Sequence, residues 1–131
     1  MRKYALDTGS IELYFAGDKF MKKVYDEVER GAARAFTLET NLAELYYKTC
    51  QKLGEEIARI RDISVRTSQI EVKEVDERIS RVAGRIKCRV RTVSLADALL
   101  AAAAKIFGAA VVTTDEDFRE ISGLRVIVLG I

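Results

Sequence analysis

Four carboxylates of this 131-residue chain stand where local structure could present them to a ligand: Asp7, Glu44, Asp97 and Asp115. The sequence contains no His. This excludes Ser-His-Asp and Cys-His catalysis and the usual zinc centres that contain His. Oxygen ligands without imidazole or thiolate favour a hard cation, so we expect any shared site to take Mg²⁺ or Mn²⁺.

Each acid also has a purely structural explanation. Asp7 follows a short apolar run and suits a turn, and Asp115 suits the N-cap of a short helix. Glu44 and Asp97 each stand three residues after a capping residue, Asn41 and Ser94, which is the spacing of a capping box. The shared cation site and these local roles are therefore competing interpretations.

Asp97 is the hardest of the four to explain as a cap. It interrupts segment 95–107, whose only other charge is Lys105. An unpaired carboxylate in a buried helix costs roughly several kcal/mol unless a cation or hydrogen bonds compensate it. Glu39 lies close to Glu44 in the sequence and remains an alternative to it.

The elements that must position these acids alternate between strand and helix. Apolar runs predict strands at 3–6, 33–38, 69–72, 109–113 and 125–129, and helical periodicity predicts helices at 11–15, 20–28, 40–53, 57–63, 75–90, 95–107 and 115–121. This alternation predicts an α/β fold with a five-stranded parallel sheet. In a doubly wound order of 3-2-1-4-5, the strands next to Asp7 and Asp115 are neighbours where the order reverses, which is where ligands bind.

The acids also carry a family resemblance. The segments Tyr4-Ala5-Leu6-Asp7-Thr8, Asn41-Leu42-Ala43-Glu44-Leu45, Ser94-Leu95-Ala96-Asp97-Ala98 and Val112-Thr113-Thr114-Asp115-Glu116-Asp117 resemble the four acidic motifs of PIN-domain ribonucleases, especially VapC-type toxins of toxin–antitoxin pairs. Their order and spacing agree over essentially the whole chain. The resemblance implies a PIN-like three-layer α/β/α domain over residues 1–131. It also implies metal binding by the four acids and by Asp117, with help from Thr8, Asn41 and Thr113.

By the same resemblance, we expect a metal-dependent endoribonuclease with an antitoxin partner and a homodimeric state. Metal-activated water would attack phosphorus and leave a 5′-phosphate. The stretch after Arg78 contains no acid before Asp97, and we expect five of its cations to contact RNA: Arg81, Arg85, Lys87, Arg89 and Arg91. A solvated helix face explains them equally well. The apolar stripe of Phe20, Val24, Tyr25 and Val28 suits either a dimer contact or the core.

Composition sets wider bounds. With 49% hydrophobic and 32% charged residues, we expect one globular domain that does not span a membrane. The first residues lack the apolar run of a secretory signal, so we expect the cytoplasm. We expect Cys50 and Cys88 to be buried thiols, although one disulfide bond remains open. The net charge of +2 is too small to indicate nucleic-acid binding.

Other functional classes remain. Asp7-Thr8-Gly9 matches the active-site signature of aspartic proteases, but the helical periodicity opposes a strand-rich protease fold. A phosphatase of the haloacid type needs a second Asp at position 9, which is Gly. A non-catalytic module that binds RNA or protein is the third alternative.

Overall fold

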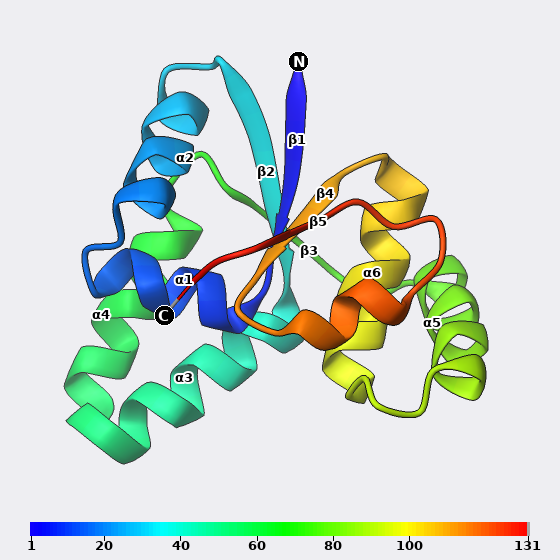
Figure 1. Cartoon of the computed structure of the whole chain (residues 1–131). Coiled ribbons are helices and arrows are strands. Elements are labelled where there is room, and N and C mark those ends of the chain that lie inside the picture. The colour runs from blue at the N-terminus through cyan, green and yellow to red at the C-terminus, as the bar shows by residue number, and fades with distance from the viewer. Residues whose placement is uncertain (131) are drawn as a thin grey trace.

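The computed structural model describes residues 1–130, which form a five-stranded parallel sheet with helices on both faces (Figure 1). The strands are β1 (Arg2–Leu6), β2 (Ala33–Leu38), β3 (Glu71–Lys73), β4 (Ala110–Thr113) and β5 (Val126–Val128). Their order is β3-β2-β1-β4-β5, and every pairing is parallel. The order and direction predicted from the sequence are therefore confirmed.

Seven helical segments connect the strands. They are α1 (Thr8–Phe15), α2 (Lys19–Glu29), α3 (Glu39–Leu53), α4 (Glu55–Arg66), α5 (Glu77–Arg89), α6 (Leu95–Phe107) and the 3₁₀ segment η1 (Glu116–Glu120). In Figure 1, α1 to α4 lie on one side of the sheet and α5 and α6 on the other. This gives the expected three-layer α/β/α arrangement, in which α3 and α4 pack against each other as a helical hairpin.

The third strand begins later than expected. Ser68 explains the difference, because its hydroxyl accepts a hydrogen bond from the Ile70 backbone N–H (3.1 Å) and donates to the Val65 carbonyl (2.7 Å). Because the Ile70 N–H is bonded to this side chain, the regular pairing of β3 with β2 starts only at Glu71.

Two apolar clusters hold the layers together. Ala5, Phe36 and Val111 belong to the cluster beneath α5 and α6, whereas Leu6 and Val112 belong to the cluster on the α1–α2 side. Alternate residues of each central strand thus enter opposite clusters, as expected for a sheet buried on both faces. Val24, Tyr25 and Val28 of the α2 stripe are buried in the second cluster. The core explanation is therefore correct for these three residues, whereas Phe20 is only partly buried.

Helix α6 brings Asp97 to the sheet. Apart from Ala96, its alanines, including Ala98, Ala101 and Ala102, have no exposed surface, and small side chains let a helix approach its neighbours closely. The helix contacts β1 and β4, the two central strands. Its middle is buried as predicted, but both ends protrude, since Leu95 is 60% exposed and Phe107 37% exposed.

Cys50 and Cys88 are unpaired. They lie on α3 and α5, in opposite helical layers. Cys88 is exposed, so the expectation of a buried thiol is wrong for that residue: it stands on the outward side of α5, whose buried residues are Ile79, Ala83 and Ile86. Within residues 1–130, no helix has both the length and the apolar character needed to cross a bilayer.

Candidate functional site

Asp7 is fixed at the end of β1 by hydrogen bonds to both carboxylate oxygens. Oδ1 accepts from the Ser10 backbone N–H (2.8 Å), which makes Asp7 the N-cap of α1. Oδ2 accepts a short hydrogen bond from the Thr113 hydroxyl. The residue is 5% exposed. The donors leave the carboxylate little freedom to rotate.

Thr113 links the two acids that follow the central strands. Besides donating to Asp7, its hydroxyl accepts from the Asp115 backbone N–H (2.9 Å). Asp115 in turn caps η1, since its Oδ1 accepts from the Asp117 N–H (2.9 Å). The strand order therefore places Asp7 and Asp115 side by side, as expected at the reversal of a doubly wound sheet.

Gly9 and Ser10 explain the rest of the Asp-Thr-Gly segment. A Cβ atom at Gly9 would collide with the Thr114 hydroxyl, so glycine lets α1 approach the turn after β4. Ser10 is fully buried, and its hydroxyl donates to the Asp7 carbonyl (3.0 Å). We did not single out Ser10 from the sequence, although its position three residues after Asp7 is the spacing of a capped helix. The segment begins a helix on a parallel sheet, which contradicts the strand-rich aspartic-protease alternative.

Glu44 reaches the site through α3. The Thr8 hydroxyl lies 3.4 Å from Glu44 Oε1 and 3.2 Å from the Asn41 carbonyl oxygen. Asn41 is not the N-cap predicted from the sequence. The helix starts at Glu39, and Asn41 Oδ1 accepts from the Leu38 N–H (3.4 Å) from the third helical position. Glu44 therefore lies in the second turn, and its proposed role in a capping box is wrong.

Glu39 is bound elsewhere. Its two carboxylate oxygens accept from Arg66 at 2.7 and 2.9 Å. Hydrogen bonds from this guanidinium lower the pKa of Glu39 below its usual value. Because Glu39 is bound by Arg66 while Glu44 contacts Thr8, Glu44 is the acid of α3 that belongs to the candidate site.

Asp97 stands in the first turn of α6, where its backbone N–H donates to the Ser94 hydroxyl (3.1 Å). Ser94 is thus the predicted N-cap. Burial, followed by repulsion from Asp7, Asp115 and Glu44, raises the pKa of the Asp97 carboxyl to about 6. The pKa of Asp97 therefore depends on the charges of the other three acids predicted from the sequence, so the four carboxylates lie close enough to repel one another.

The pKa values of two neighbouring acids, Asp7 and Asp117, are raised as well. Burial raises the pKa of Asp7 against the opposing effect of its hydrogen bonds, and Asp115 raises it further. Repulsion from Asp115 raises the pKa of Asp117. Lys48 lies 3.8 Å from Glu44, but within residues 1–130 no ion pair joins Asp7, Asp97, Asp115 or Asp117 to a Lys or Arg. The pKa values of Asp7, Asp97 and Asp117 are thus raised, and no ion pair within the described residues offsets the repulsion at these three acids.

The donor set suits a hard divalent cation, because its members are carboxylate oxygens with unneutralised charge. Among the described residues 1–130, however, no three acidic side chains are already arranged as a coordination shell. Asp7 and Asp115 each use one oxygen for a cap, and Thr113 orients Asp7. In the described part of the chain Asp97 forms no ion pair, whereas Glu44 is 3.8 Å from Lys48. The chemistry of these donors therefore fits a hard divalent cation.

The five predicted RNA-contact residues differ in their surroundings. Arg85 and Arg89 line a cavity of about 550 Å³ between α5, α6 and the residues after η1, together with Arg78 and Lys105. Arg81 is paired with Glu77 (3.2 Å), and Lys87 donates to the Val93 carbonyl (2.8 Å). Arg91 is exposed in the turn before α6. Arg85 and Arg89 therefore line this open cavity, which we call the α5 groove, whereas Arg81 and Lys87 already have partners.

Comparison with protein families and solved structures gives a consistent result. The PIN domain family model matches residues 4–124. No curated protein sequence matches significantly. The DNA-bound VapBC structure from Salmonella typhimurium is similar with a TM-score of 0.80 and 22% identity, covering 98% of both chains.

Two further solved structures show the same likeness. VapBC2 from Rickettsia felis, bound to a promoter DNA fragment, has a TM-score of 0.77 and 18% identity over 96% of this chain and 98% of that one. VapC20 from Mycobacterium tuberculosis, described as a toxin that cleaves the sarcin-ricin loop, has a TM-score of 0.72 and 20% identity over 91% and 95% of the two chains. At these identities the structures establish a common fold.

Replacing Asp97 with Asn should stabilise the metal-free protein near neutral pH. The folded pKa of about 6 exceeds the unfolded value of about 3.9. The ionised carboxylate is therefore disfavoured in the fold above pH 6, and this penalty disappears below about pH 4, where both states are protonated. Asn removes the penalty at the cost of a favourable helix-dipole interaction worth roughly 0.3–1 kcal/mol.

We expect the Asp97→Asn protein in EDTA to melt higher than wild type at pH 7.5, by roughly 2–5 °C for about 1 kcal/mol. The difference should vanish at pH 4. Thermal unfolding followed by circular dichroism measures both values. Asp18→Asn is the matched control, because Asp18 caps α2 through the Met21 N–H (2.9 Å) and Asn caps equally well. A variant that is no more stable than wild type at pH 7.5 would contradict the repulsion among these acids.

Proposed function

The chain belongs to the PIN domain family, since the family model covers residues 4–124, and from this premise we propose that it is a Mg²⁺- or Mn²⁺-dependent endoribonuclease. The observation that supports the proposal most is the raised pKa of Asp97, caused by burial and by Asp7, Asp115 and Glu44. These acids meet at the carboxyl ends of the central strands, where α/β proteins bind ligands. A cation would relieve their repulsion.

In this proposal Asp7, Asp97 and Asp115 hold the cation, with Glu44 and Asp117 at its margin. A divalent cation, when bound, would polarise the scissile phosphate and lower the pKa of a coordinated water molecule. Thr113 and Ser10 hold the Asp7 carboxylate in a fixed orientation before substrate arrives, which lowers the entropic cost of assembling the site. With water as nucleophile, the products carry a 5′-phosphate and a free 3′-hydroxyl.

The substrate strand is proposed to follow the groove beside α5. Arg85, Arg89 and Lys105 line this groove with only Glu120 as a lining acid. Glu120 accepts a hydrogen bond from Thr92. Cations that are free of acidic partners bind phosphates and release counterions, which makes binding dependent on salt. Helix α6 joins this groove to Asp97, because Lys105 and Asp97 both belong to it.

We further propose that the enzyme is the toxin of a toxin–antitoxin pair. Several structures of the same fold are described as VapBC complexes or toxin–antitoxin complexes, which supports an antitoxin partner. The α3–α4 hairpin exposes large apolar side chains, namely Tyr47, Leu53, Ile57, Ile60 and Ile63. Exposed apolar patches mark protein contacts. In the isolated chain a second copy would cover this hairpin face, giving a homodimer.

Catalysis is tested by isosteric replacement of the acids. Asp7→Asn, Asp97→Asn and Asp115→Asn should each lower the rate of RNA cleavage by at least ~100-fold, because each removes charge where the transition state needs it. Cleavage of a structured RNA with Mn²⁺ or Mg²⁺, followed by analysis of the product ends, is the measurement. Stabilisation of the fold by Mn²⁺ should be lost in parallel.

Asp18→Asn and Asp76→Asn are the controls, since both residues cap helices through backbone N–H groups (Met21 and Ile79). They should keep full activity and the full metal response. If the site variants also kept their metal response, the shared cation site would be wrong. A wild-type protein that binds RNA without cleaving it in either metal would favour the non-catalytic binding module.

The groove is tested by charge reversal. Arg85→Glu with Arg89→Glu should weaken RNA binding in EDTA and reduce the slope of log affinity against log salt by roughly 1.4, for two lost contacts with a single strand. Fluorescence anisotropy across a salt series measures this slope. Lys52→Glu with Arg59→Glu, two exposed cations of α3 and α4, is the control of equal charge. An unchanged slope in the groove variant would place the RNA elsewhere.

The oligomeric state is tested by light scattering. The wild-type chain should be a dimer at micromolar concentration, and Ile60→Glu with Ile63→Glu should shift it to a monomer, because both side chains are more than half exposed and charge is costly in an apolar interface. Retained secondary structure by circular dichroism is the control. A wild-type monomer at high micromolar concentration would count against the homodimer.

A further inference from the structure

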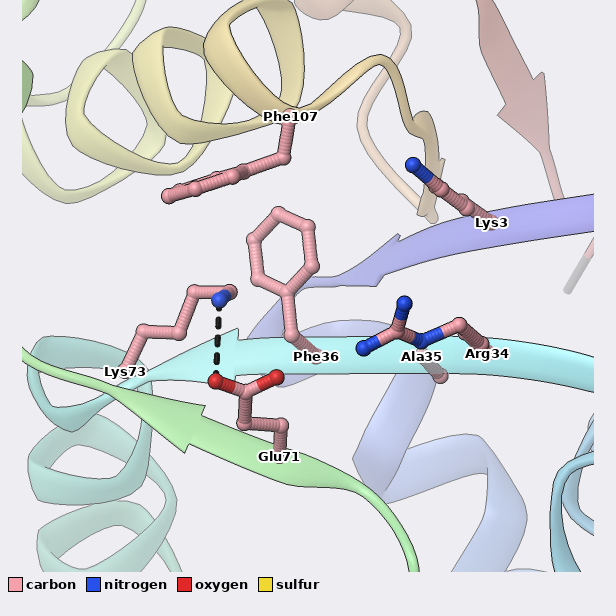
Figure 2. A pocket seen from close by; sticks show the side chains of 7 residues that line it. All are labelled: Lys3, Arg34, Ala35, Phe36, Glu71, Lys73 and Phe107. Carbon is pink, nitrogen blue, oxygen red and sulfur yellow. Dashed lines mark hydrogen bonds and ion pairs between the residues drawn. The ribbon is translucent and has the colours of Figure 1, made fainter.

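A small cavity lies at the end of α6 remote from Asp97, between Phe107 and strands β1, β2 and β3 (Figure 2). Its volume is about 90 Å³, and its lining includes Lys3, Arg34, Phe36, Glu71, Lys73 and Phe107. The three basic side chains surround the two rings in Figure 2. None of these residues takes part in the proposed cleavage reaction.

Lys3 and Arg34 form a like-charge pair. They are directly opposite each other in the parallel register of β1 and β2, and both head groups extend to the same side of the sheet, toward the cavity (Figure 2). Like charges at opposed positions of neighbouring strands are destabilising. Within residues 1–130, neither side chain forms an ion pair with an acid. The fold therefore keeps two adjacent cations without internal compensation.

The one carboxylate of the cavity does not neutralise them. Glu71 is 2.9 Å from Lys73, and this pair lies in β3. The Lys73 ammonium is also 4.1 Å from the centroid of the Phe107 ring and 5.5 Å from that of Phe36. Lys73 is thus satisfied by an acid and two aromatic faces, whereas the charges of Lys3 and Arg34 stay available to an anion.

We propose that this cavity binds a backbone phosphate of single-stranded RNA, as a subsite remote from the cleavage centre. The proposal rests on the proposed ribonuclease function. Its size supports a group of a larger molecule, because about 90 Å³ is well below the roughly 300–1,000 Å³ of pockets that enclose whole ligands. Arg34 offers a planar fork of donors and Lys3 a point charge, and both geometries suit phosphate oxygens.

Two features favour a nucleic-acid strand over an acidic peptide. The Phe107 ring at the rim is 37% exposed, and aromatic rings beside basic grooves stack on nucleobases irrespective of sequence. Lys3 lies in β1 and precedes Asp7, the residue that follows this strand, by four residues, which is about 13 Å in an extended chain. One RNA strand a few nucleotides long can therefore reach from the acids to this cavity.

The test measures RNA binding in EDTA, where no cleavage occurs. A short labelled single-stranded RNA is titrated with the wild-type protein, with the cavity variant Lys3→Gln/Arg34→Gln and with a control variant. The control, Lys52→Gln/Arg59→Gln, removes the same amount of charge from helices α3 and α4, on the other side of the sheet from α6. The cavity variant should bind roughly tenfold more weakly, with a salt slope smaller by about 0.7 for one lost phosphate contact. The control should match wild type. Without RNA, the cavity variant should melt at the same or a higher temperature, because a repulsive pair is gone.

Equal weakening in both variants would overturn the proposal, since it would reflect net charge alone. A loss of polyglutamate binding with unchanged RNA binding would overturn it in favour of an acidic protein segment, and a response to inorganic phosphate alone would overturn the assignment to RNA. Because the assay needs no metal, its outcome is independent of catalysis. Inactive wild-type enzyme would refute the proposed reaction, whereas unaltered RNA binding by the cavity variant would refute only the subsite.

Discussion

Repulsion among carboxylates at the carboxyl ends of the central strands is the constraint on which the rest of the site depends. Asp7 and Asp97 have raised pKa values because they are buried near other acids. The fold offsets this cost with backbone N–H groups, since Asp7 and Asp115 accept from the first turns of α1 and η1. A parallel sheet makes this possible, because each strand is followed by a helix whose positive N-terminal end points toward the same edge.

Capping and ligand binding are therefore compatible roles of the same carboxylate. Asp18 and Asp76 cap α2 and α5 with equally good geometry, so a capping bond does not identify a functional acid. The difference lies in the neighbours. The charged groups that raise the pKa of Asp97 are acids from other elements, brought together by α6 and by the adjacency of β1 and β4. This uncompensated charge is what a divalent cation or a stabilising substitution would relieve.

The helical layers also divide the surface by chemistry. The layer of α5 and α6 carries the groove of Arg85 and Arg89 and, near the end of α6, the pair of Lys3 and Arg34. The α3–α4 hairpin of the other layer exposes isoleucines instead. This separation suits a chain that binds a polyanion on one side and a protein on the other. A net charge of only +2 gives no indication of this arrangement, because it is a sum over the whole chain.

The sequence by itself determined the sheet, the helices and the four acids, because periodicity and capping preferences are local and the motif order covers the chain. Only the tertiary structure decided that Asn41 lies inside α3, that Glu39 is bound by Arg66 and that Cys88 is exposed. It also decided which cations are free, pairing Lys87 with backbone carbonyls and setting Lys3 against Arg34. The physical reason is that partners, register and burial depend on contacts between segments far apart in the chain, and local propensity carries no information about them.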